Sequence, residues 1–280
     1  MRRIGTAACH ALAMLLTLIA PASAQVTDFT TIDVPGASTT LPRGINPEGD
    51  IVGFYSVGTT FRGFLLRQGV AIDIERPGAT ATRPRSINSQ GEIVGFYVTG
   101  GVTHGFLYVE GNFITIDVPG ASSTQPFGIN ARGDIVGQFT AGGTNHGFLL
   151  DAGDNLTTID FPGAASTGAF GINPRGDIVG QYSAGGATHG FLLDKHGNFT
   201  TIDFPDASST QPIGINARGD ISGMYLAGGI THGFLLDKQG GFTPVDFPGA
   251  SSTAAQGINA QGEVVGTYTG GGVTHGFLAR

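Results

Sequence analysis

The sequence predicts an all-β fold built from a repeated unit, and three observations support this. Glycine supplies 48 of 280 residues, while only 12% of the chain is charged and 40% is hydrophobic. Glycine combined with β-branched and aromatic residues is typical of short strands joined by tight turns. No segment after Gln25 has a helical period, and the triplet Gly-Ile-Asn recurs every 42 or 43 residues. The six copies begin at Gly44, Ser86 (where serine replaces glycine), Gly128, Gly171, Gly214 and Gly257.

Each unit is expected to form four short antiparallel strands. In the fourth copy the strands are predicted at residues 167–173, 177–182, 188–194 and 199–204. The first two are joined by Asn-Pro-Arg-Gly, which has Asn, Pro and Gly at favoured positions of a type I turn. The third strand is apolar on consecutive residues and is expected to be covered on both faces. The fourth strand alternates and suits a half-exposed outer position.

Six such units predict a six-bladed β-propeller with four antiparallel strands per blade, because propeller blades contain roughly 40–50 residues. The chain beyond residue 25 starts on a fourth strand, residues 29–33, and stops on a third strand, residues 275–278. We therefore expect the N-terminal strand to join the last blade and close the ring. An open solenoid is the alternative, but it would need distinct capping segments.

The N-terminus has the features of a signal peptide over residues 1–24. Arg2 and Arg3 precede the apolar stretch 11–20, and Ala-Ser-Ala at 22–24 is a suitable cleavage site. The apolar stretch is too short to span a bilayer, and no later stretch is longer. Residues 25–280 are therefore predicted to form one propeller domain of a secreted or periplasmic protein. Cys9, the single cysteine, lies in the predicted signal, so no disulfide is expected.

The recurring Gly-Ile-Asn-x-x-Gly-Asp-Ile-Val-Gly and His-Gly-Phe-Leu segments resemble the bacterial extracellular repeats of the HAF family. Glycine follows the histidine where the family has alanine, and Arg62 replaces the histidine in the first copy. The resemblance covers residues 28–280. It implies an exported bacterial protein with a propeller-like array, and it implies no reaction and no catalytic residue.

Composition and motifs favour a secreted, non-enzymatic, monomeric scaffold that binds or displays a partner. The net charge of −7 argues against nucleic acid. No recognised catalytic motif is present, and no metal or cofactor is expected. The expected partner is a polar or anionic ligand or a cell-surface glycan. The alternative is an extracellular glycan-active hydrolase or lyase with its site at the channel mouth, for which the acids to test are Glu110, Asp154 and Asp206.

Arginines break the repeat in the first two units and mark a candidate ligand site. Arg43 and Arg85 occupy a position that holds Phe, Ile or Gln in the other copies. If the blades are adjacent, these two lie side by side with Arg83 close by, and Arg62 belongs to the same units. Such a patch could bind a carboxylate or sulfate. The alternative is a set of salt bridges with Glu48, Glu75 or Glu92.

A threonine recurs in every copy where the chain enters the first strand, and Thr40 and Thr82 are its first two examples. These hydroxyls could bind a polar ligand at the channel mouth, or they could bond to the backbone.

Other repeated polar residues are expected to be structural. The histidine before Gly-Phe-Leu is expected to bond to a neighbouring blade, because equivalent histidines of a ring cannot converge on one metal ion. The Asp before x-Pro-Gly is expected to accept bonds from the backbone of the turn that follows. The adhesion tripeptide Arg-Gly-Asp at 132–134 is explained by the repeated Gly-Asp turn.

Overall fold

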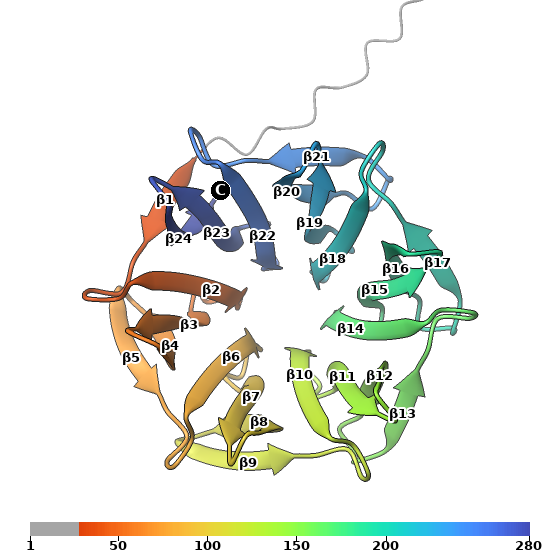
Figure 1. Ribbon diagram of the computed structural model, residues 1–280, viewed down its shortest axis with the longest axis horizontal. Helices are drawn as coiled ribbons and strands as arrows, with labels where there is room; N and C mark the ends of the chain where they lie inside the picture. The colour runs from red at the N-terminus through yellow and green to blue at the C-terminus, as the bar shows by residue number, and fades with distance from the viewer. Residues whose placement is uncertain (1–27) are drawn as a thin grey trace, which may run out of the picture.

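The computed structural model describes residues 28–280, which form 24 β-strands and no helix. The chain is therefore all-β, as predicted, and its sheets surround a central axis (Figure 1). Nothing among the described residues could cross a membrane as a helix. The predicted signal peptide at 1–24 lies outside the described residues.

The strands occupy four positions that increase in distance from the axis (Figure 1). The inner strands are β2 (Thr39–Ile45), β6 (Ala81–Ile87), β10 (Ser123–Ile129), β14 (Ser166–Ile172), β18 (Ser209–Ile215) and β22 (Ser252–Ile258). The second strands are β3 (Ile51–Val57), β7 (Ile93–Thr99), β11 (Ile135–Ala141), β15 (Ile178–Ala184), β19 (Ile221–Ala227) and β23 (Val264–Gly270). The third strands are β4 (Thr60–Arg67), β8 (Val102–Val109), β12 (Thr144–Leu150), β16 (Ala187–Leu193), β20 (Ile230–Leu236) and β24 (Val273–Ala279). The outer strands are β1 (Phe29–Ile32), β5 (Val70–Ile74), β9 (Asn112–Ile116), β13 (Leu156–Ile159), β17 (Phe199–Ile202) and β21 (Phe242–Val245).

Four consecutive strands pair antiparallel as a quartet, beginning with β2–β5. The last quartet combines β22–β24 with β1, in which Phe29 lies opposite Ala279. Single parallel bridges, such as Phe61 with Ala81, link some neighbouring quartets. Hydrogen bonding therefore joins the strands into three sheets of four, twelve and eight strands.

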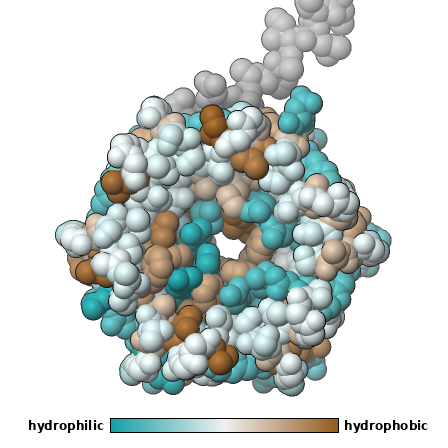
Figure 2. All heavy atoms as spheres, in the orientation of Figure 1, coloured by the Kyte–Doolittle hydropathy of each residue, from teal (hydrophilic) through white to brown (hydrophobic). Residues whose placement is uncertain are grey.

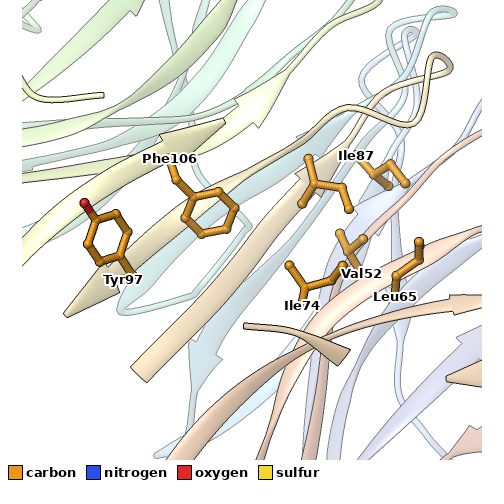
Figure 3. Packing of buried hydrophobic residues seen from close by; sticks show 7 residues of the cluster. Val52, Leu65, Ile74, Ile87, Tyr97 and Phe106 are labelled. Atoms are coloured by element: carbon orange, nitrogen blue, oxygen red, sulfur yellow. The ribbon is translucent and has the colours of Figure 1, made fainter. Parts of the chain in front are cut away.

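The hydrophobic core lies between neighbouring quartets. One cluster packs Val52, Leu65 and Ile74 of the first quartet against Ile87 and Phe106 of the second (Figure 3). The phenylalanine after His-Gly, or after Arg-Gly in the first copy, is at most 1% exposed in every copy. The Gly of Ile-Val-Gly makes room for that ring. A Cβ on Gly137 would lie 2.6 Å from the ring of Phe148. Residues of the last quartet pack on the first in the same way, with Val265 beside Ile45.

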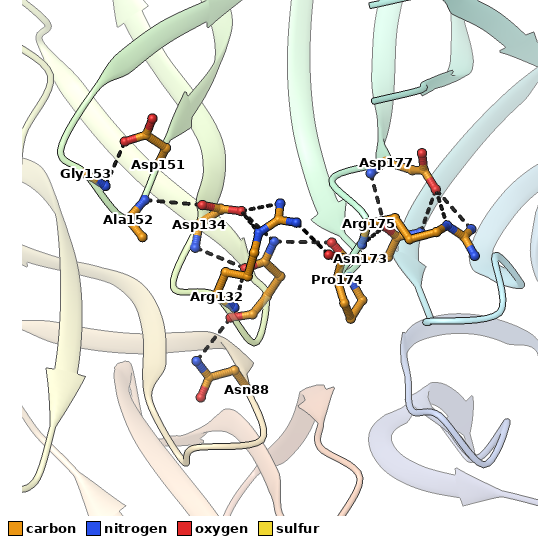
Figure 4. Close-up of polar contacts among 11 residues, drawn as sticks. Asn88, Arg132, Asp134, Asp151, Ala152, Gly153, Asn173, Pro174, Arg175 and Asp177 are labelled. Atoms are coloured by element: carbon orange, nitrogen blue, oxygen red, sulfur yellow. Dashed lines mark hydrogen bonds and ion pairs between the residues drawn. The ribbon is translucent and has the colours of Figure 1, made fainter. Parts of the chain in front are cut away.

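We call the end of the axis where the inner strands stop the asparagine end, because the six asparagines of the repeated triplet gather there. Asn130 Nδ2 donates to the backbone oxygen of Asn173 in the next quartet, at 3.2 Å. The same bond joins the last quartet to the first, from Asn259 Nδ2 to Asn46 O. The amide of Asn130 also donates to Asp134. Figure 4 shows Asp134 with Asn88, Arg132 and Asn173 at this end.

The Arg-Gly-Asp turns join neighbouring quartets at the same end. Arg132 pairs with Asp134 and donates to the oxygen of Pro174 in the next quartet. Burial raises the pKa of the Asp134 carboxyl, but hydrogen bonds from Asn130 and Arg132 outweigh it and leave that pKa below its ordinary value. The tripeptide is therefore bound within its own fold.

Candidate functional site

A cavity of about 340 Å³ runs along the axis and is lined mainly by the inner strands. Hydrophilic residues gather around its opening in the space-filling view (Figure 2). Close contacts between inner strands narrow it. A Cβ on Gly171 would lie 2.5 Å from the backbone oxygen of Ile213. We call the opposite end, where the inner strands begin, the threonine end.

Three arginines of the first two quartets meet at this cavity, as the sequence predicts. Arg43 and Arg85 line it from adjacent inner strands. Both guanidinium groups lie over the ring of Phe54, at 5.1 and 5.3 Å from the centroid. Arg83, two residues before Arg85, lies beside the cavity and stacks 4.3 Å from the centroid of Phe61. We call these three residues the arginine wall.

The arginine wall has no anionic partner within residues 28–280. The arginine ion pairs of this part of the chain are made by other residues: Arg62, Arg67, Arg132, Arg175, Arg218 and Arg280. The Nε atoms of Arg43, Arg83 and Arg85 are buried and have no hydrogen-bond partner among the described residues. The alternative of salt bridges with Glu48, Glu75 or Glu92 is therefore not realised for these three arginines.

Burial lowers the pKa of these unpaired guanidinium groups. Burial, together with the charge of Arg83, lowers the pKa of Arg43 to about 10. Burial also lowers the pKa of Arg85 well below its ordinary value, and the charges of Arg43 and Arg83 add to this. Aromatic rings partly stabilise these cations through cation–π contacts. An anion entering the cavity would provide the missing opposite charge.

Glutamines on other quartets line the same cavity. Gln138 and Gln181 come from second strands, and Gln211 and Gln256 come from inner strands. Gln138 Nε2 donates to Gln125 Oε1 at 2.9 Å, which orients its amide. We call Gln138, Gln181 and Gln211 the amide wall. The sequence analysis missed this wall, although the position that holds Gln138 and Gln181 varies between copies as the arginine position does.

The structure does not bring Arg62, Thr40 or Thr82 to the arginine wall. Arg62 is half exposed and pairs with Glu75 at 3.3 Å, which is one of the predicted alternatives. Thr40 and Thr82 are buried, and each Oγ1 accepts a backbone N–H, from Val34 and from Arg76 respectively. These threonines therefore fix the segment that leads from one quartet into the first strand of the next.

The repeated histidines and aspartates differ from expectation in their partners. His146 Nδ1 bonds to Asp160 at 3.0 Å, and both residues belong to one quartet. The histidine also stacks on Phe139 of the second strand. The same pair forms in the other four histidine-bearing quartets, so the histidine bonds within its own quartet and not to a neighbour.

The three acids proposed for testing in a glycan enzyme lie away from the cavity. Glu110, Asp154 and Asp206 have left-handed backbone angles, with φ of 49°, 62° and 62°, in exposed turns. No group of three or more His, Cys, Asp or Glu in the described part of the chain could hold a metal ion.

Similar solved structures share this fold at low sequence identity. An inactive variant of virginiamycin B lyase from Staphylococcus aureus with quinupristin has a TM-score of 0.54 at 12% identity, covering 90% of this chain and 99% of that one. A gluconolactonase from Xanthomonas campestris has a TM-score of 0.53 at 13% identity, covering 92% of each chain. TolB from Acinetobacter baumannii has a TM-score of 0.58 at 12% identity, covering 86% of this chain and 63% of that one. No family model and no curated protein matches the sequence.

These comparisons establish a propeller-like all-β fold and correct one expectation. The prediction of a non-enzymatic scaffold is contradicted, because the solved structures of this fold include a lyase, a gluconolactonase and a hydrolase. The alternative of a hydrolase or lyase agrees better with them.

Proposed function

We propose that this chain is a secreted lyase that cleaves uronate-containing glycans in its axial cavity. The observation that carries the proposal is the arginine wall, which presents three guanidinium groups without a carboxylate partner in residues 28–280. A uronate carboxylate is a planar anion that guanidinium groups can bind through paired hydrogen bonds. Phe127, whose ring centroid lies 5.4 Å from the Arg85 guanidinium, and Phe170 line the cavity and offer apolar faces on which a sugar ring can pack.

A lyase fits the cavity better than a glycoside hydrolase. Hydrolysis of a glycoside uses two carboxyl groups, roughly 5–10 Å apart. Neither Asp nor Glu is among the described residues that line the cavity. Elimination instead needs neutralisation of the uronate carboxylate and a base beside it. Among proteins of similar fold, streptogramin B lyase and virginiamycin B lyase are also lyases by description.

The arginines have different roles in the elimination. Arg43 binds the uronate carboxylate from the cavity wall, and its charge, together with that of Arg83 beside the cavity, makes the proton on the adjacent carbon more acidic. Burial and the charges of Arg43 and Arg83 lower the pKa of Arg85, and we propose that its neutral form accepts that proton. The released electron pair forms a carbon–carbon double bond, and the bond from the next carbon to the leaving oxygen breaks. Arg85 then returns its proton to the leaving oxygen.

The proposal includes the finer architecture and the location. We infer a closed ring of six blades, each a quartet, because Ile32 pairs with Gly276 and Asn259 reaches Asn46. We also propose that the chain belongs with the HAF-type repeats, acts as a monomer and is exported by the signal at 1–24.

Turnover of polyuronates tests the function. The protein is incubated with polygalacturonate, alginate, hyaluronan and heparin, and the ultraviolet absorbance of the unsaturated product is followed. Arg85→Gln, which copies Gln256 of the sixth repeat, is expected to lower kcat/KM by about a hundredfold or more, since it removes charge stabilisation and the base.

Arg132→Gln is the matched control, because glutamine already occupies the equivalent turn position at Gln90 and Gln261. It removes the same charge at the asparagine end and is expected to retain turnover within about twofold, as surface ion pairs contribute little. Absence of an unsaturated product on every polyuronate, or equal losses in both variants, would refute the proposal.

A further inference from the structure

The amide wall carries a feature that packing alone does not explain. Gln181 Oε1 is buried and accepts no hydrogen bond from any described residue. Buried acceptors nearly always have a donor, so this oxygen marks a place where a donor is missing. Gln181 lines the same cavity as Arg43 and Arg85.

The surroundings of Gln181 combine the amide of Gln138 with the ring of Phe170. Gly168 on β14 stands where the neighbouring inner strands carry Gln125 and Gln211, so the wall has no side chain there. A Cβ at Gly168 would lie 2.9 Å from Gln138 Oε1, which shows that the Gln138 amide occupies part of that space. Met224 replaces glutamine at the equivalent position of the fifth quartet and also lines the cavity.

We propose that the amide wall is a second sugar subsite, which binds the neutral unit next to the uronate held by the arginine wall. Gln181 Oε1 accepts a hydrogen bond from that unit, either from a hydroxyl or from an acetamido N–H. Gln211 and Met224 complete the subsite with a polar and an apolar surface. The inference rests on the proposed function and names the substrate class as a glycan in which uronate alternates with a neutral sugar.

A structural role alone would not leave this acceptor unpaired. The fold accepts methionine at the same position, so glutamine is not required for packing in the ring. The position is occupied by Phe54 and Phe96 beside the arginines and by amides farther around the axis. The cavity therefore has a cationic aromatic side and a neutral polar side, which suits two chemically different sugar units.

Calorimetric titration of the full chain tests this subsite. Three probes are used: glucuronate, a uronate–hexose disaccharide and a uronate–N-acetylhexosamine disaccharide. Gln181→Met, which copies Met224, is expected to weaken disaccharide binding about tenfold and to leave glucuronate binding unchanged. Weakening of both disaccharides identifies a hydroxyl as the donor, whereas weakening of the acetylated one alone identifies the acetamido N–H.

Two variants separate this inference from the proposed function. Gln239→Met changes an exposed glutamine in the hairpin 237–241 and is expected to change no affinity. Arg43→Gln is expected to weaken all three probes. If Gln181→Met leaves both disaccharide affinities unchanged while Arg43→Gln weakens glucuronate, the subsite is refuted and the lyase proposal stands. If no probe binds, or Arg43→Gln has no effect, both fail.

Discussion

The asparagine end and the middle of the axial channel differ in how closely the six repeats agree. At the asparagine end, every repeat supplies the same asparagine and an acidic residue four positions later. Each asparagine is at most 4% exposed. In the middle of the inner strands, between that asparagine and a threonine that also recurs in every copy, the position of Arg43 and Arg85 holds arginine, phenylalanine, isoleucine or glutamine. Positions that are the same in every repeat therefore have satisfied hydrogen bonds, whereas positions that vary between repeats carry the unpaired groups of the arginine and amide walls.

This difference shows how a repeat protein can acquire a site. Residues that join one quartet to the next must recur, because each junction has the same geometry. Residues that face the channel are free to differ, since they contact only the cavity and its ligand. The departures from the repeat are consequently the most informative residues for function.

The largest loss of stability is expected at the asparagine end. Asn130→Ala removes the amide that donates to Asp134 and Asn173 and the oxygen that accepts from the backbone of Arg132 and Asp134. We expect the free energy of unfolding to fall by about 2–3 kcal/mol, because buried partners are left unpaired. Denaturant unfolding measures the change.

Asn155→Ala is the control for that prediction, because Asn155 also bonds an aspartate, Asp151, but in an exposed turn. Its cost should stay below about 1 kcal/mol. Equal costs for the two variants would mean that the asparagine ring is not a special element of stability.

A smaller effect of opposite sign is expected at the arginine wall. Arg43→Gln should raise the free energy of unfolding by about 1 kcal/mol at neutral pH, because it removes a buried cation that has no carboxylate partner. Loss of cation–π contacts offsets part of this gain. A destabilising result would indicate that the arginine is needed for packing.

The pH dependence sharpens this prediction. The pKa of Arg43 is about 10 in the folded state, which is below its ordinary value, so the unfolded chain binds more protons than the folded chain above pH 10. The penalty of the buried cation is therefore complete below pH 10 and is relieved as the pH rises from 10 toward the ordinary pKa of arginine. The excess free energy of unfolding of Arg43→Gln over the unsubstituted protein should shrink over that pH range. A difference that stays constant with pH would contradict the lowered pKa of Arg43.

Much of the fold could be predicted from the sequence because the same structural unit occurs six times in it. The strand expected at 188–194 is β16 (Ala187–Leu193), and the strand expected at 199–204 is β17 (Phe199–Ile202). The meeting of Arg43 and Arg85 also follows from their equivalent positions on neighbouring units.

The amide wall could not be predicted by simple alternation. Each inner strand contains a register shift, for example between Pro126 and Gly128, which changes the residues of the second strand that face the channel. The partner of each histidine could be found only by counting residues across the hairpin between the third strand and the outer strand. Gly147 lies opposite Ile159, so His146 is brought beside Asp160. Burial of the arginines depends on aromatic rings from four strands, which no single segment reveals.

The most direct test of the account is a crystal structure of the protein soaked with glucuronate. We predict the sugar in the axial cavity, with its carboxylate within hydrogen-bond distance of Arg43 and the adjacent carbon facing Arg85. A well-ordered glucuronate bound only at the asparagine end or between outer strands, with the arginine wall unaltered, would contradict it.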